Sequence, residues 1–343
     1  VSQKEKSIID PTDTVYQATY SNNYLDFLVI GDWGSSGKDK NLKYGSQANV
    51  SKVMEDVTRR NSSHFIVNVG DNFYERFKGD YEGIKSIDDN KWQEVWLNVY
   101  NGPTLSSLTW YSVAGNHDWY NNVTAQIDYS RTRNSRFFLP SLFYVRTSTF
   151  GSESKTTVAW IHIDTNMFYY DFSSESNKLN ARKKNLKENL YGFGWETDNA
   201  MEEKLKWIES KLIEYQHYKW LFVVGHHPVL GQCSEIFRMS RLLQLFETYR
   251  ITAYFAGHNH VLQYKSPSKK SPIAHFISGA ASTTGTKCKG GDWGIKTFGF
   301  LHVVINDNDL KFEYIDATKS IKPGGKVIFQ GALNGREIWY PKY

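Results

Sequence analysis

The chain has 343 residues, of which 40% are hydrophobic and 22% charged, with a formal net charge of +5. This composition is ordinary for a soluble globular protein and excludes a chain that is disordered throughout, because it holds enough apolar residues for a large core. No run of about eighteen apolar residues occurs, so the sequence predicts no membrane span.

The first 23 residues are polar and include Pro11, which favours an extension lying on the protein surface. The pattern changes at Tyr24, and from there we expect one large domain over residues 24–343, with no internal repeat. The two cysteines, Cys233 and Cys288, are too few for a disulfide framework, and the sequence leaves open whether they pair.

Strands and helices are expected to alternate in the first half of this domain. The apolar run 26–30 predicts a buried strand, and residues 44–60 repeat Val50, Val53 and Val57 at helical spacing. Strands at 64–69 and 108–114 flank a helix around Trp92 to Val99. Further strands are expected at 157–163, 220–224, 251–255, 274–278, 298–305 and 310–315, and helices at 201–215 and 239–249. The pattern predicts an α/β (α+β) fold of sheets flanked by helices.

Long polar loops are expected at 81–90, 171–199 and 279–296. Loops of that length within a compact domain often form binding or lid elements. They are the candidate determinants of substrate choice.

Five of the predicted strands end in a glycine followed by metal-binding residue types. The segments are Gly31-Asp32-Trp33-Gly34, Gly70-Asp71-Asn72-Phe73-Tyr74, Gly115-Asn116-His117-Asp118, Gly225-His226-His227-Pro228 and Gly257-His258-Asn259-His260. Strand ends form the rim of an open sheet where ligands bind, so these side chains can meet although they are distant in sequence. Carboxylate, amide oxygen, imidazole and phenolate together suit two hard or borderline cations.

Each segment alone has an ordinary structural explanation. Asp32 and Asp71 could cap a helix or stabilise a turn, and a single histidine is more often a hydrogen-bonded structural residue. All five explanations would have to hold at once, however. The complete set therefore favours a metal centre.

The order and spelling of these segments resemble the metallophosphoesterase superfamily, and within it the purple, or tartrate-resistant, acid phosphatases. The resemblance covers residues 24–315 and is most specific at Gly-Asp-Trp-Gly, at Tyr74 and at Gly-His-His-Pro-Val. It implies a four-layer α/β/β/α sandwich of two mixed sheets. It also implies that residues 24–343 form a single catalytic domain.

The resemblance further implies an Fe(III) ion beside a divalent iron, zinc or manganese ion. The implied ferric ligands are Asp32, Asp71, Tyr74 and His260, and the implied divalent ligands are Asp71, Asn116, His226 and His258. Asp71 would bridge the two ions. A phenolate from Tyr74 on ferric iron would give the colour that names the family.

The implied reaction is hydrolysis of phosphate monoesters by a metal-activated hydroxide. His117 resembles the family's general acid, and Asp118 is expected to orient it. His227 departs from the tyrosine of the mammalian enzymes, which leaves open whether it contacts substrate or only packs. No second substrate-side histidine is evident after Pro228.

Three other functions compete with this one. A manganese- or zinc-dependent phosphodiesterase or nucleotidase of the same superfamily would have no phenolate ligand such as Tyr74. An inactive binding scaffold would not need a complete ligand set. Nucleic-acid binding is not expected, since no element carries a clustered basic stripe.

We expect a monomer whose partners are small phosphorylated substrates and the inorganic phosphate product. The sequons at Asn49, Asn61 and Asn122, together with the resemblance, favour a secreted glycoprotein or a vacuolar or lysosomal one.

Overall fold

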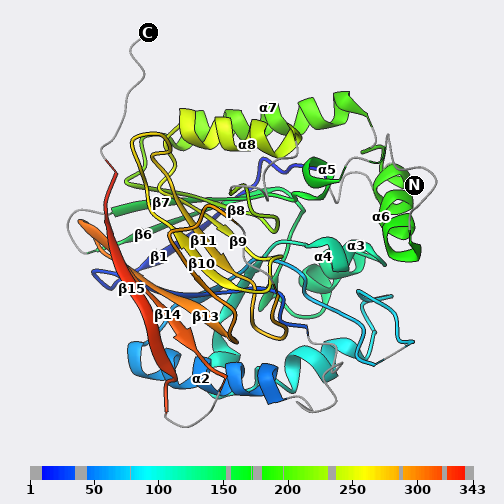
Figure 1. The fold of residues 1–343 in the computed structure, drawn as a ribbon, viewed down its shortest axis with the longest axis horizontal. Coiled ribbons are helices and arrows are strands. Elements are labelled where there is room, and N and C mark those ends of the chain that lie inside the picture. Colours follow the sequence, from blue (N-terminus) through cyan, green and yellow to red (C-terminus); the bar gives the residue numbers. More distant parts are fainter. Residues whose placement is uncertain are drawn as a thin grey trace.

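The computed structural model describes residues 10–34, 45–77, 79–151, 156–170, 172, 180–195, 197–230, 237–285, 289–318 and 323–336. Within these ranges two mixed β-sheets face each other, and helices cover their outer faces (Figure 1). The predicted four-layer α/β/β/α sandwich is confirmed.

The eight-stranded sheet has the order β1-β6-β7-β8-β9-β11-β10-β12. Its strands are β1 (Val15–Tyr20), β6 (Tyr144–Phe150), β7 (Thr156–His162), β8 (Trp220–Val224), β9 (Ala253–Ala256), β10 (Leu262–Lys265), β11 (Ala274–Ser278) and β12 (Trp293–Ile295). β7, β8, β9 and β11 are parallel neighbours. The segments that follow β8 and β9 therefore leave the sheet at the same edge.

The seven-stranded sheet has the order β15-β14-β13-β2-β3-β4-β5. Its strands are β2 (Leu25–Ile30), β3 (Phe65–Asn68), β4 (Thr109–Ser112), β5 (Phe137–Phe138), β13 (Gly299–Ile305), β14 (Asp309–Asp316) and β15 (Lys326–Asn334). β2, β3 and β4 run parallel, so the three N-terminal motifs also leave their sheet at one edge.

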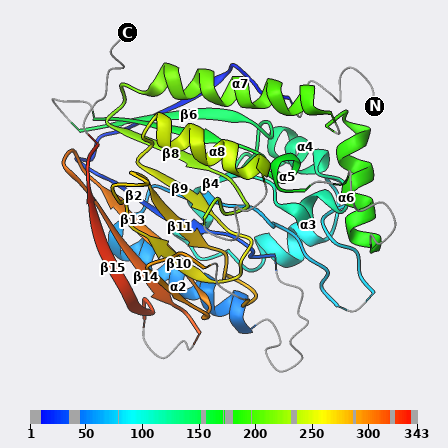
Figure 2. The same ribbon diagram turned by 45° about the horizontal axis from the view of Figure 1, so that its top comes forward.

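Helices cover both outer faces of the sandwich. α7 (Asp198–Tyr215) and α8 (Phe237–Thr248) lie over the eight-stranded sheet, whereas α2 (Gly45–Asn61) lies under the other sheet (Figures 1 and 2). The remaining helices are the π-helix η1 (Trp92–Leu97), the 3-10 helix η2 (Leu105–Ser107), α3 (Asn116–Trp119), α4 (Thr124–Thr132), α5 (Asn166–Tyr169) and α6 (Ala181–Gly192). None of the helices in the described ranges is long and apolar enough to cross a bilayer.

The continuous apolar run of β2 follows from its position between two layers. Phe27 and Val29 point into the cluster between the sheets, whereas Leu28 and Ile30 point into the cluster shared with α2. A strand that is covered on both faces needs apolar residues at every position. The same packing explains why most of the predicted strands were recognisable as short apolar runs.

Several segments differ from the sequence-based expectation, among them the predicted loop 171–199 and the N-terminal extension. The predicted polar loop 171–199 contains helix α6, which buries only Leu186 and Leu190 and so lacks a strong apolar stripe. The predicted surface extension 1–23 contributes β1, which pairs in parallel with β6 at the edge of the eight-stranded sheet. The side chains of β1 are half-buried or exposed, which is why its sequence carries no core signal.

A buried charge pair joins β2 to β13 inside the seven-stranded sheet. His302 Nε2 lies 2.9 Å from Asp26 Oδ2, and Ser63 donates to the other oxygen of Asp26 at 2.5 Å. Burial lowers the pKa of His302, but Asp26 and Glu313 outweigh burial and raise that pKa to about 9. His302 is therefore charged and paired near neutral pH.

The raised pKa of His302 predicts a pH-dependent contribution to stability. Because the folded pKa of about 9 exceeds the ordinary value of 6.5, the contribution is complete below pH 6.5 and is lost as pH rises through 9. We expect the free energy of unfolding to fall by about 1–3 kcal/mol over this range, and to fall less in His302→Gln.

Denaturant unfolding between pH 6 and 10 measures the effect, with the exposed His217 changed to Gln as the matched control. An identical pH slope in the wild type and His302→Gln would contradict the prediction.

Candidate metal centre

The five predicted motifs converge where the two sheets meet. Asp32 follows β2, Asp71 follows β3 and Asn116 begins α3 just after β4. His226 follows β8, and the segment with His258 and His260 follows β9. Each sheet therefore supplies part of one site.

Tyr74 lies at the centre of a first group of four donor atoms. Its Oη lies 3.0 Å from Asp32 Oδ1, 2.8 Å from Asp71 Oδ2 and 3.2 Å from His260 Nε2. His260 Nε2 is also 3.1 Å from Asp32 Oδ1. These are the four residues that the resemblance assigned to the ferric ion.

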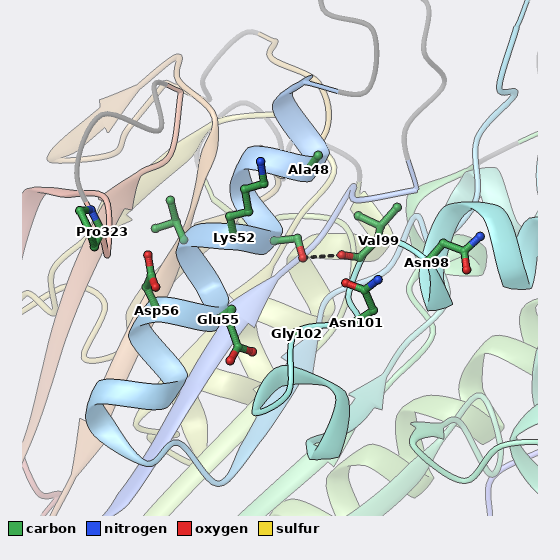
Figure 3. A pocket seen from close by; sticks show the side chains of 11 residues that line it. Ala48, Lys52, Glu55, Asp56, Asn98, Val99, Asn101, Gly102 and Pro323 are labelled. Carbon is green, nitrogen blue, oxygen red and sulfur yellow. Dashed lines mark hydrogen bonds between the residues drawn. The ribbon is translucent and has the colours of Figure 1, made fainter.

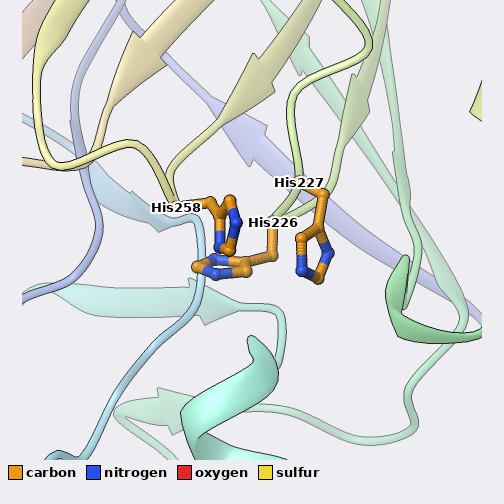
Figure 4. Close-up of side chains that lie close together, drawn as sticks. All are labelled: His226, His227 and His258. Carbon is orange, nitrogen blue, oxygen red and sulfur yellow. The ribbon is translucent and has the colours of Figure 1, made fainter. Parts of the chain in front are cut away.

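A second group shares the carboxylate of Asp71. His226 Nε2 lies 3.3 Å from Asp71 Oδ2, and His258 Nδ1 lies 3.0 Å from Asn116 Oδ1. Figure 4 shows the rings of His226 and His258 side by side, and their centroids are 5.2 Å apart. The structure thus brings together the four residues assigned to the divalent ion, with Asp71 common to both groups.

The backbone adopts a rare conformation at four of these residues. Asp32, Asp71, His258 and His260 have φ between 46° and 67°, and the only other non-glycine residues with positive φ in the described ranges are Ser62 and Arg250. This left-handed region is unfavourable for residues with a side chain, and such strain gathers at functional sites. The strand-to-loop turns hold these side chains in place at a conformational cost.

Two glycines let the motifs approach each other closely. A Cβ at Gly115 would lie 2.2 Å from Asp71 Oδ1, and a Cβ at Gly257 would lie 2.4 Å from Asp32 Oδ2. Any side chain at either position would displace a carboxylate of the site. The glycines before Asn116 and His258 are therefore needed for close approach.

Several ionisable side chains of the site are buried close together, and their pKa values are shifted. Burial opposes ionisation of Asp71, but His226 and then His117 hold its pKa well below the usual range. Burial lowers the pKa of His226, and Asp71 reverses this and raises it to about 9. Burial, with the charges of Asp32 and Asp71, raises the pKa of Tyr74 well above its ordinary value.

The donor set fits two metal ions. Two buried carboxylates and a phenol within hydrogen-bonding distance would repel one another if all were ionised, and a cation among them removes that repulsion. His226 Nδ1 is fixed by the carbonyl of Val69 at 2.8 Å, and the buried Nε2 faces Asp71 Oδ2 at 3.3 Å. A ring held through one nitrogen, with the other directed at the carboxylate of a predicted ligand, is typical of a metal ligand. Nitrogen and oxygen donors without thiolate suit iron, zinc or manganese.

His117 lies beside the site, but its ring contacts Glu82. His117 Nδ1 is 2.8 Å from Glu82 Oε2, whereas His117 Nε2 is 4.0 Å from Asp71 Oδ2. Asp118 instead accepts hydrogen bonds from the backbone N–H groups of Gly115 and Asn72. The expected orientation of His117 by Asp118 is therefore corrected, because the carboxylate of Asp118 is occupied in joining two loops.

His227 is fully buried beside the second group. Thr165 Oγ1 accepts the backbone N–H of His227 at 3.0 Å and lies 2.8 Å from its ring Nδ1. The ring stacks on Tyr169 at 4.0 Å, and Nε2 has no hydrogen-bond partner. His226, His227 and His258 each place one nitrogen within 4.8 Å of the others (Figure 4).

Three further residues around the site were missed by sequence reasoning. They are Glu82, Lys91 and Arg182. The buried ammonium of Lys91 donates to the carbonyls of Tyr74 and Gly83, both at 2.9 Å, and so holds the loop between them. No local pattern marks these residues, since each acts through contacts distant in sequence.

Two pockets lie outside the cluster of donors. A pocket of about 550 Å³ along α2 is lined by charged residues such as Lys52, Glu55 and Asp56, and by none of the predicted ligands (Figure 3). A pocket of about 440 Å³ lies between α6 and the segment from Tyr120 to Thr124. Its wall includes Tyr120, whose hydroxyl accepts a hydrogen bond from Asn116 at 2.8 Å. One residue of this wall therefore also contacts a predicted ligand.

Some expectations lie outside the described residues. These are the two cysteines, Cys233 and Cys288, and residues 231–235 of the segment after Pro228 where a second substrate-side histidine was sought.

Comparison with known proteins gives a family match over most of the chain. The profile of the calcineurin-like phosphoesterases matches residues 25–262. Human tartrate-resistant acid phosphatase type 5 is 27% identical, and the match covers 91% of each chain. Purple acid phosphatase 4 of Arabidopsis thaliana is 30% identical over 78% of this chain and 71% of its own.

Solved structures extend the likeness in fold. The GAP50 anchor in the inner membrane complex of Plasmodium superposes with a TM-score of 0.70 at 21% identity, over 92% of this chain and 90% of its own. A purple acid phosphatase from yellow lupin seeds gives 0.58 at 13% identity, over 92% of this chain and 55% of its own. At these identities the comparison shows the fold alone.

The close approach at Gly115 predicts a selective loss of metal binding. Gly115→Ala should push the Asp71 carboxylate away from both donor groups, and we expect metal affinity to fall by at least about tenfold. Elemental analysis after dialysis against a weak chelator measures the metal retained per folded chain.

Gly192→Ala is the matched control, because nothing lies within 4 Å of a Cβ built there. Equal metal retention by the two variants would contradict the assigned role of Asp71.

Proposed function

The chain belongs to the calcineurin-like phosphoesterase family, and from that premise we propose that it is an acid phosphatase acting on phosphate monoesters at an Fe(III)–M(II) pair. Hydrolysis of phosphate esters follows from the family and from relatives that are acid phosphatases. We propose in addition the identity of the metals, the class of substrate and the role of each residue.

Tyr74 is the observation that carries the proposal. Its hydroxyl lies within 3.2 Å of donor atoms on Asp32, Asp71 and His260. A phenol that is buried against two carboxylates stays protonated unless a strongly acidic cation binds it, and ferric iron is such a cation. We assign the ferric site to Asp32, Asp71, Tyr74 and His260, and the divalent site to Asp71, Asn116, His226 and His258.

The chain's own residues handle the proton of the reaction. Bound metal ions would acidify a water molecule and neutralise charge on the phosphate oxygens. When the phosphorus–oxygen bond to the leaving group breaks, the departing oxygen takes a proton from His117 Nε2. That nitrogen faces the shared carboxylate of Asp71. A water oxygen forms the new bond to phosphorus, so the products are an alcohol and inorganic phosphate.

Asp118 has a positioning role in this scheme. By accepting from the N–H groups of Gly115 and Asn72, it fixes the loop that carries Asn116 against the loop that carries Asp71. Gln126 also donates to Asp118, at 2.8 Å. The distance between ligands from β3 and β4 therefore depends on a carboxylate that does not itself reach the donor groups.

His227 is assigned to the wall of the divalent site. The Thr165 hydroxyl accepts the backbone N–H of His227 and can donate its own hydrogen to Nδ1, which places the ring proton on Nε2. In that tautomer His227 is a hydrogen-bond donor beside His258. Complete burial and stacking on Tyr169 favour a packing and orienting role over direct substrate contact.

The cellular setting is proposed from the sequence. The exposed sequon at Asn122 favours a secreted, vacuolar or lysosomal enzyme, and the net charge of +5 would help to attract phosphorylated substrates. A monomer is expected, with no nucleic-acid partner.

Two alternatives remain distinct from this proposal. A manganese- or zinc-dependent phosphodiesterase or nucleotidase would use the same ligands without a phenolate bond to iron. An inactive scaffold would resemble the Plasmodium anchor in role as well as in fold, and the converging donor atoms of both groups favour catalysis over that alternative.

A visible absorption spectrum of the metal-replete protein tests the role of Tyr74. We expect a broad band at roughly 500–600 nm, because tyrosinate-to-iron charge transfer requires a phenolate on Fe(III). Tyr74→Phe should abolish the band, whereas Tyr191→Phe, which changes an exposed tyrosine, should leave it unchanged.

Metal analysis and a phenyl phosphate assay at acidic pH accompany the spectrum. A colourless, active protein that contains manganese or zinc would replace the proposal with the phosphodiesterase or nucleotidase alternative. A protein that binds no metal and hydrolyses nothing would favour the scaffold.

A further inference from the structure

The ring of His117 is fixed on three sides by side chains and backbone of this chain. It packs against the ring of Tyr74 at 4.1 Å and against that of Tyr120 at 4.9 Å. The third contact is polar, between Nδ1 and Glu82 Oε2 at 2.8 Å. Glu82 binds the nitrogen that faces away from the metal-binding residues, which leaves Nε2 directed toward them.

Glu82 is hydrogen-bonded at Oε2 and forms an ion pair at Oε1. Its Oε2 accepts the backbone N–H of Glu75 at 3.0 Å in addition to the His117 contact. Its Oε1 lies 2.5 Å from Nη2 of Arg182, which also reaches Glu75 Oε2 at 3.0 Å. The side chain of Glu82 is only 6% exposed, so its negative charge is paired inside the protein. A carboxylate bound in this way has one orientation.

Arg182 belongs to helix α6, inside the segment 171–199 that the sequence presented as a polar loop. α6 packs on the segment that carries His117: Asn189 Nδ2 donates to the carbonyls of Trp119 and Asn121, at 2.6 and 3.1 Å. Leu186 and Leu190 bury its inner face. The helix is therefore linked to His117 in two ways. One link is the backbone around α3, and the other is the Arg182–Glu82 pair.

We propose that Glu82 positions His117 as proton donor and that Arg182 fixes Glu82, so that helix α6 forms part of the proton-delivery machinery. This inference rests on the proposed function. Glu82 accepts the Nδ1 hydrogen of His117, and the transferable proton then resides on Nε2. After that proton passes to the leaving oxygen, the neutral ring keeps its hydrogen on Nδ1. The carboxylate fixes the orientation of the ring before transfer and its tautomer after it.

A purely structural role for Glu82 makes a different prediction. If Glu82 only tied α6 to the loop beside Tyr74, its replacement would lower turnover of every substrate by a similar factor. A positioning role affects only reactions in which the leaving oxygen needs a proton. Substrates that differ in leaving group therefore separate the two roles.

The test compares Glu82→Gln on phenyl phosphate and on 2,4-dinitrophenyl phosphate. Phenolate is a poor leaving group and needs the proton, whereas dinitrophenolate leaves without it. We expect kcat for phenyl phosphate to fall by about 10–100-fold and kcat for the dinitrophenyl ester to change by less than about threefold. Metal content per chain should equal that of the wild type.

Three further variants complete the comparison. Arg182→Gln should change kcat in the same direction but less, because Arg182 is 42% exposed and Glu82 keeps its contact with His117. Lys184→Gln, on an exposed face of the same helix, should change neither rate. In a His117→Ala background, Glu82→Gln should cause no further loss on phenyl phosphate.

An equal loss on both substrates, or a further loss in the His117→Ala background, would overturn the positioning role and leave the proposed function intact. A wild-type protein that hydrolyses neither ester would overturn the proposed function, and the inference with it.

Discussion

One buried carboxylate, that of Asp71, is shared by both groups of donor atoms and organises this site. Asp71 Oδ2 lies 2.8 Å from the hydroxyl of Tyr74 and 3.3 Å from Nε2 of His226, so it joins Tyr74, which follows a strand of the seven-stranded sheet, to a histidine that follows a strand of the eight-stranded sheet. Asp71 Oδ1 accepts the backbone N–H of His117 at 2.8 Å. The relative placement of the two sheets, the turn after β3 and the position of His117 therefore depend on the same side chain.

This dependence on Asp71 explains why unfavourable backbone conformations are tolerated around the site. Four predicted ligands have left-handed backbone conformations, and Gly115 and Gly257 leave no room for a side chain next to a carboxylate. The aromatic packing of the two cores and the buried pair of Asp26 and His302 stabilise the sheets that carry these turns. Strain at the site is tolerated because the surrounding layers determine the backbone path.

The predicted ligands could be picked out in the sequence because their motifs follow short strands of the two sheets. The strands themselves were recognisable where both faces are buried, as in β2 and β8. β6 was not recognised because Arg146 points between the sheets, where its guanidinium lies 3.8 Å from the ring centroid of Tyr111 and 4.5 Å from that of Trp160. Glu82 and Arg182 could not be found in this way, since their significance depends on a helix with only two buried leucines folding back on α3. The orienting role given to Asp118 was wrong for a related reason: adjacency in sequence placed it next to His117, but the backbone turn directs its carboxylate elsewhere.

Anomalous diffraction from crystals of the metal-replete protein, measured on both sides of the iron absorption edge, tests the two-metal account most directly. The account predicts two separate peaks, with the iron signal among the donors of Asp32, Tyr74 and His260, and the second metal beside Asn116, His226 and His258. A single metal, or iron found only on the side away from Tyr74, would contradict it.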